Sequence, residues 1–142
     1  MKNKILLLGL FCCSLISAKA QVLLDKGTGK NSFPIVSSLT NAVVCFDGKD
    51  ATVVRKSASL FVDDVRRVTG QELKMDESKP GRVSARYAII AGTIGESGWI
   101  DALVSRNKID TAAIAGGWER YMIEVVNNPV PGIKKAIVVA GS

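Results

Sequence analysis

A regular apolar stripe between residues 54 and 68 places the strongest constraint on the fold of this chain. Its members recur at spacings of four, three, four and three residues, at Val54, Ala58, Phe61, Val65 and Val68. This period predicts an amphipathic helix of about five turns that lays one face on a core. Asp50 is a candidate N-cap for this helix, and Gly70 falls where a C-terminal cap glycine belongs.

Short apolar runs rich in β-branched residues surround this helix and predict the strands of a sheet. They lie at residues 33–36, 42–46, 72–75, 87–91, 121–126 and 133–140. Residues 39–41 are expected to close a hairpin between the first two runs. Residues 127–132 hold two prolines and a glycine, and they should close an antiparallel hairpin between the last two runs. A second, shorter helix is expected over residues 99–106.

These elements follow one another in the order ββαβ, then βα, then ββ. The order predicts an α/β (α+β) domain, with a mixed β-sheet and two main helices packed on it. Residues 21–32 are polar and contain two glycines, so we expect a flexible leading segment before a domain that spans residues 33–142. That length suits one domain with one hydrophobic core.

The first twenty residues have the pattern of a secretory signal peptide. Lys2 and Lys4 give a positive start, residues 5–16 are apolar, and residues 18–20 supply a small-x-small cleavage pattern. The apolar run is too short to span a bilayer comfortably. We therefore expect an exported chain, periplasmic or extracellular, with no membrane attachment after cleavage. A lipoprotein signal at Cys12 is the alternative, and the bulky phenylalanine before it disfavours that alternative.

Charge and residue content exclude several classes of site. Cleavage would leave Cys45 as the single cysteine, and the chain has no histidine. This removes internal disulfides, Cys–His and Ser–His catalytic pairs and histidine metal ligands. Cys45 lies in an apolar run, which favours a small buried hydrophobe over a nucleophile. Loss of three lysines with the signal leaves 16 basic and 13 acidic residues, and these form no tract of the kind that binds nucleic acid. No cofactor and no metal are expected.

A glycine-rich stretch, Gly92-Thr93-Ile94-Gly95-Glu96-Ser97-Gly98, connects a predicted strand to the second predicted helix. Such a loop can hold a phosphate group at the helix N-terminus. The glycine spacing here differs from the G-x-G-x-x-G of dinucleotide sites, and Glu96 would bring a negative charge to the phosphate position. A tight turn between strand and helix is therefore favoured.

Several longer motifs occur in a fixed order along the chain. They are D-V-R-R-V-T-G at the end of the first helix, I-I-A-G-T-I-G at 89–95, G-W-E-R-Y at 117–121, N-P-V-P-G at 128–132 and V-V-A-G-S at 138–142. Over about residues 33–142, this series resembles the N-terminal domain of glycoside hydrolase family 115, the xylan α-1,2-glucuronidases. The first motif is also similar to the small N-terminal domain of other α-glucuronidases and of β-hexosaminidases.

The resemblance implies a non-catalytic accessory domain of a secreted hydrolase active in xylan degradation. In that family the chain continues into a TIM barrel that holds the catalytic acids, so residues 33–142 would be a domain incomplete at its C-terminal end. No catalytic motif position of the family falls in this chain, and we expect no catalytic residue here. The expected partners are that barrel and, through it, a glucuronoxylan-type polysaccharide from which (4-O-methyl)glucuronic acid is removed.

Side chains that could contact sugar are few. Glycoside hydrolysis normally needs two carboxyl groups about 5–10 Å apart, whereas Glu96, Glu119 and Glu124 are expected on a turn and on two sides of one strand. Trp99 and Trp118 could stack on sugar rings or pack on the missing domain, although tryptophans in an aromatic-poor chain are often core residues. The alternative function is a stand-alone carbohydrate-binding or interaction domain without catalysis. A small independent enzyme is the least favoured.

Overall fold

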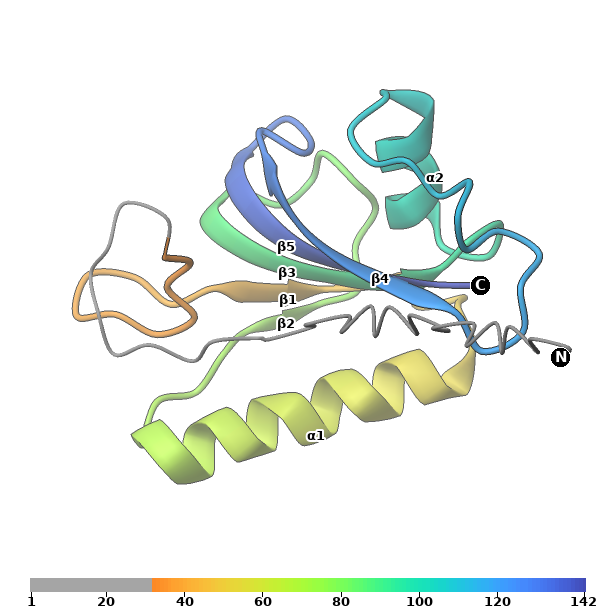
Figure 1. Ribbon diagram of the computed structural model, residues 1–142. Coiled ribbons are helices and arrows are strands. Elements are labelled where there is room, and N and C mark those ends of the chain that lie inside the picture. Colours follow the sequence, from red (N-terminus) through yellow and green to blue (C-terminus); the bar gives the residue numbers. More distant parts are fainter. Residues whose placement is uncertain (1–31) are drawn as a thin grey trace, which may run out of the picture. The chain divides into compact units, whose positions relative to one another are not determined.

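The computed structural model describes residues 32–142, of which Phe33–Ser142 form one compact unit (Figure 1). The signal peptide and most of the leading segment expected from the sequence lie outside the described residues. The described strands are β1 (Val43–Cys45), β2 (Met75–Asp76), β3 (Ala85–Thr93), β4 (Tyr121–Asn127) and β5 (Ile133–Gly141). The described helices are α1 (Thr52–Thr69) and α2 (Gly98–Ser105).

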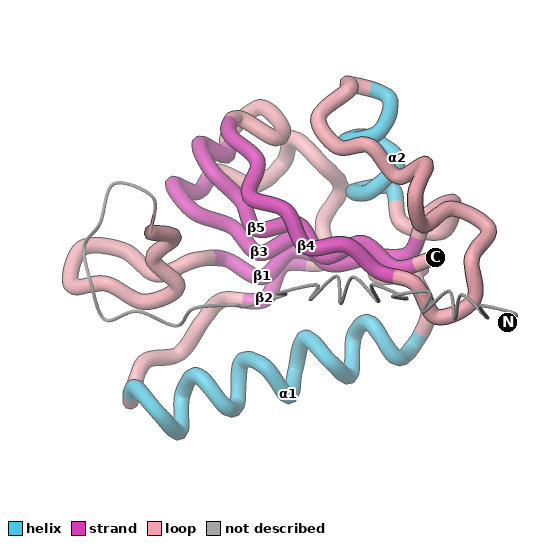
Figure 2. The backbone as a smooth tube through the Cα atoms, viewed as in Figure 1, coloured by secondary structure: helices cyan, strands magenta, loops and turns pink. Residues whose placement is uncertain are grey.

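All five strands belong to one mixed sheet in the order β2-β1-β3-β5-β4 (Figure 2). Strands β1, β2, β3 and β5 are parallel, and β3 pairs with β5 along its whole length, from Ala85 opposite Ile133 to Thr93 opposite Gly141. Strand β4 is antiparallel to β5 and forms one edge. The predicted α/β class, the mixed sheet, its two helices and the final antiparallel hairpin are confirmed.

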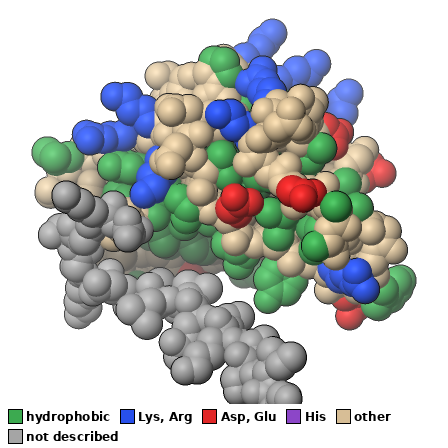
Figure 3. All heavy atoms as spheres, turned by 45° about the horizontal axis from the view of Figure 1, so that its top comes forward, with side chains coloured by type: hydrophobic (Ala, Val, Ile, Leu, Met, Phe, Trp, Pro, Cys, Tyr) green, Lys and Arg blue, Asp and Glu red, His purple; other side chains and the backbone are tan. Residues whose placement is uncertain are grey.

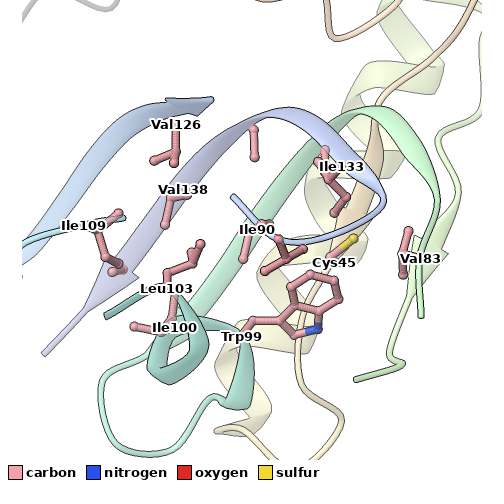
Figure 4. Close-up of a cluster of buried hydrophobic side chains, with 14 of the residues drawn as sticks. Cys45, Val83, Ile90, Trp99, Ile100, Leu103, Ile109, Val126, Ile133 and Val138 are labelled. Atoms are coloured by element: carbon pink, nitrogen blue, oxygen red, sulfur yellow. The ribbon is translucent and has the colours of Figure 1, made fainter. Parts of the chain in front are cut away.

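The two helices cover opposite faces of the sheet, with α1 below and α2 above it in Figure 1. Alternate residues of each strand point to opposite faces. On β3, Ile90 faces α2 and Ile89 faces α1. The α2 side holds the larger core, in which Trp99, Ile100 and Leu103 point toward the strands (Figure 4). Each face of the sheet therefore has its own hydrophobic cluster.

Helix α1 matches its prediction in length and C-terminal cap but differs at three positions. Gly70 has the left-handed conformation of a C-terminal cap, with φ of 71°. Asp50 is not the N-cap, because Ala51 holds that position and the Asp50 carboxylate bonds elsewhere. Val68 is 85% exposed, and Val62 is buried in its place. The apolar stripe thus shifts by part of a turn near the end of the helix.

The predicted strand at residues 33–36, and its hairpin with the next strand, are wrong. Residues 33–36 form no strand, although Ile35 accepts one backbone hydrogen bond from Ala42, at 2.9 Å. Pro34 cannot donate to a sheet ladder. Phe33 instead packs edge-on against Tyr87 of β3, with ring centroids 5.6 Å apart. The apolar character of this segment therefore reflects side-chain packing on the α1 face.

Candidate functional site

The carboxyl ends of the parallel strands form the first place to seek a site. The chain leaves β1 toward α1 on one face and leaves β3 toward α2 on the other. In open α/β sheets, ligands commonly bind where neighbouring strands diverge in this way. Here the divergence lies between β1 and β3, which are adjacent, and it includes the glycine-rich loop at residues 92–98.

The carboxylates of the protein itself fill this position. Asp47 Oδ2 accepts a hydrogen bond from the N–H of Gly98, the first residue of α2, at 3.0 Å. Asp50 Oδ2 accepts from the N–H of Thr93 at 2.9 Å, and Asp101 Oδ1 accepts from the N–H of Gly95 at 3.1 Å. The N–H groups that would hold a phosphate therefore already bond to carboxylates. The loop is a tight connection tied to the β1–α1 turn.

The two tryptophans occupy opposite environments. Trp99 is fully buried among hydrophobic side chains (Figure 4), and its Nε1–H donates to the backbone oxygen of Ser78 at 2.8 Å. Its expected role as a sugar or domain-interface contact is corrected, because the ring belongs to the core beneath α2. Trp118, in the loop before β4, is 87% exposed and stays available for contact.

Cys45 is the buried thiol that its sequence context favours. It lies in β1 within the α2-side core, and burial, reinforced by the negative charge of Asp76, raises the pKa of its thiol from 9.0 to about 12. A nucleophilic cysteine requires a lowered pKa and an accessible position. Cys45 has neither of these properties.

Alkylation of Cys45 by iodoacetamide at pH 8 should be at least about tenfold slower in the folded chain than in 6 M urea, since little thiolate forms in the core. Mass spectrometry of timed samples measures the rate of modification. Rapid labelling of the native protein would show that the core at β1 opens readily.

The raised pKa of the Cys45 thiol also implies that the thiol contributes stability fully below pH 9, and that this contribution is lost as the pH rises toward 12.

The carboxylates considered for catalysis do not form an oriented pair. Glu96 lies in the glycine-rich loop, and Glu119 precedes β4 instead of lying on it. Glu124 lies on β4 and lines an open groove of about 590 Å³ together with Asp110, a proximity that the sequence did not reveal. Both side chains are exposed, and no hydrogen bond among residues 32–142 orients Glu124. Within the same residues, no cluster of three acidic or cysteine ligands suits a metal ion.

A half-uncovered sheet face is the most prominent surface feature. Helix α1 lies over β1, β2 and β3, and it leaves β5 and the edge strand β4 open on the same side. Tyr121, Ile123 and Val125 of β4 point to this side and are 69%, 52% and 47% exposed. Ile137 and Val139 of β5 lie beside them and are partly exposed. We call these five residues the β4–β5 apolar face.

No protein-family model matches the chain, and no curated protein matches it. No helix within the described residues is long and apolar enough to cross a membrane.

Proposed function

We propose that this domain is a non-catalytic part of an exported glycoside hydrolase that resembles the α-glucuronidases acting on xylan. It would pack against the catalytic TIM barrel of the same polypeptide and would not itself contact the scissile bond. The β4–β5 apolar face is the observation on which the proposal depends. The resemblance of the ordered motifs at 89–95, 117–121 and 128–132 to that family is what suggests the substrate class.

The chemistry of the β4–β5 apolar face favours a protein partner. Where one side of a sheet faces water, its outward positions are commonly polar. Here Tyr121, Ile123 and Val125 occupy every second position of β4 on the open side. Such contiguous apolar surface marks an interaction site. Trp118 lies three residues before β4 and adds a further exposed aromatic ring.

A stand-alone carbohydrate-binding domain is the second candidate. Its supporting observation is the exposed indole of Trp118, which could stack on a pyranose ring. The second ring expected for such a platform, Trp99, is in the core. One exposed ring next to an aliphatic sheet face fits protein docking better than a sugar platform.

The proposal is tested with the complete gene product isolated from its source and assayed for glucuronic acid release from glucuronoxylan. We expect a polypeptide much larger than 15.1 kDa that has this activity. The double variant Ile123→Lys/Val125→Lys should lower the unfolding free energy of that product by about 2 kcal/mol or more, because two charges would enter an apolar interface. In the 142-residue chain alone, the same exposed positions should change stability by less than about 0.5 kcal/mol.

Leu39→Lys is the matched control, because Leu39 is 88% exposed and lies outside the β4–β5 apolar face. It should be neutral in both proteins. A gene product no larger than 15.1 kDa and without glucuronidase activity would contradict the proposal. An equal effect of the double variant in the long and the short protein would argue against docking at this face.

A further inference from the structure

A basic groove lies at the end of the sheet where β3 and β5 begin, opposite the end that has the glycine-rich loop. The groove has a volume of about 560 Å³, within the range of small-ligand sites. The turn between β4 and β5 and the segment after α2 form its walls. Its polar lining comes from Ser84, Arg106, Lys108, Asn128 and Lys134.

Three cations line this groove, two from the segment after α2 and one from β5. Arg106 is the C-cap of α2, Lys108 follows two residues later, and Lys134 lies on β5. No acidic residue lines the groove, and none of the three forms a salt bridge within the described part of the chain. Figure 3 shows Lys and Arg side chains at several places over the upper part of the view. The dipole of α2 accounts for cations near its C-terminus, but it does not account for Lys134 on the sheet.

The backbone holds the groove in a fixed shape. Asn128 N–H donates to the carbonyl oxygen of Lys134 at 2.8 Å, and Ala85 N–H donates to that of Gly132 at 2.8 Å. Gly132 has φ of 91°, and a Cβ there would lie 2.4 Å from the carbonyl oxygen of Val83. The turn is therefore locked against the start of β3. A site formed before its ligand arrives loses little conformational entropy on binding.

The rest of the lining indicates which kind of anion fits. Pro131 supplies an exposed apolar surface, whereas Pro129 and Val130 beside it are buried, and Ser84 and Asn128 supply a hydroxyl and an amide. Apolar C–H faces, hydroxyl groups and negative charges occur together in acidic sugars. No aromatic residue lines the groove, so it lacks the stacking surface on which single-stranded nucleic acids depend.

We propose that this groove binds an acidic oligosaccharide. Sugar carboxylates pair with Arg106, Lys108 and Lys134, and a pyranose C–H face packs on the exposed Pro131 of the β4–β5 turn. Ser84 and Asn128 bond to sugar hydroxyl groups. This site shares no residue with the β4–β5 apolar face, so a result that contradicts one proposal does not contradict the other.

The test is calorimetric titration of the full 142-residue chain with tetragalacturonate at low salt. We expect saturable binding that weakens as NaCl rises, because exposed charges are screened. The double variant Arg106→Gln/Lys134→Gln should raise Kd about 10- to 25-fold, because the loss of each exposed ion pair should raise Kd by up to about fivefold. The methyl ester of the same tetrasaccharide, which has no carboxylate charge, should bind at least about tenfold more weakly.

The matched control is Lys56→Gln/Arg67→Gln, which removes the same charge from exposed positions of α1 outside the groove. It should change Kd less than about twofold, and circular dichroism checks that all variants are folded. An equal loss of affinity in the control variant would show that binding depends only on net charge, and it would overturn the site. Equal binding of the methyl ester, tighter binding of an eight-residue oligothymidylate, or no saturation at millimolar sugar would each overturn the assignment.

Discussion

Trp99→Ala should lower the free energy of unfolding by about 3–5 kcal/mol, as expected for removal of a fully buried indole. The side chain is completely inaccessible and sits between α2 and the sheet, where its Nε1–H also bonds to the Ser78 carbonyl oxygen. A domain of this size typically has 5–15 kcal/mol of stability in total, so the melting temperature should fall by about 10–20 °C. Urea denaturation followed by far-UV circular dichroism measures the change.

Two companion variants make the result specific. Trp118→Ala should change stability by less than about 0.5 kcal/mol, because that ring lies almost wholly in solvent. Trp99→Phe keeps most of the apolar volume but leaves the Ser78 carbonyl oxygen without its donor, so an intermediate loss is expected. If Trp118→Ala were the more destabilising of the two alanine variants, the assignment of Trp99 to the core would be wrong.

Gly92→Ala should destabilise the domain by about 2–3 kcal/mol, in the range of overpacked cores. An added Cβ would lie 2.3 Å from Ser97 Oγ, 2.5 Å from Ser97 Cβ and 2.9 Å from Ile100 Cγ1. Rotation of the Ser97 hydroxyl cannot relieve the contact with its Cβ, so the first turn of α2 must move. The glycine is thus needed for close packing of helix on strand. Thermal unfolding of the purified variant measures the loss.

Two further variants test this explanation. Gly141→Ala changes a glycine on the neighbouring strand β5, where an added Cβ meets nothing within 4 Å, and it should be nearly neutral. Gly92→Ala/Ser97→Gly removes the nearest clashing atoms and should recover part of the stability, which a double-mutant cycle quantifies. Ser97 is a fitting partner, because its buried hydroxyl has no hydrogen-bond partner among the described residues to lose. No recovery in the double variant would contradict a steric role for Gly92.

Sequence periodicity predicted most of the fold because burial and local geometry agree over the longer elements. Helix α1 and strands β3, β4 and β5 were located within a few residues. Short segments were harder, since their pairing depends on distant chain. Strand β2 has two residues, and it is defined by its parallel pairing with β1. Residues 33–36 have a strand-like composition, but they form no strand. Phe33 packs against Tyr87, and Pro34 has no N–H to donate to a neighbouring strand.

The sequence could not predict which residues are exposed or lie together on the surface, for a different reason. Trp99 and Trp118 have the same chemistry, and only the packing of α2 decides which one is buried. The basic groove is lined by residues from three segments that are separated by 20 or more positions, so no local sequence motif indicates it. The open half of the α1-side face is formed by residues 121, 123 and 125 of β4 and residues 137 and 139 of β5. Its location on β4 required the strand order, which places β4 at the edge.

The unequal burial of the two tryptophans also gives the protein a pair of separate optical reporters. Trp99, held in the core with its N–H bonded, should emit at short wavelength and resist quenching by iodide. Trp118, which stands in solvent beside β4, should emit at long wavelength and be quenched readily. Loss of the first signal would follow unfolding of the domain, and a shift of the second alone would follow an event on its surface. A single cuvette could therefore separate folding from association without any attached dye.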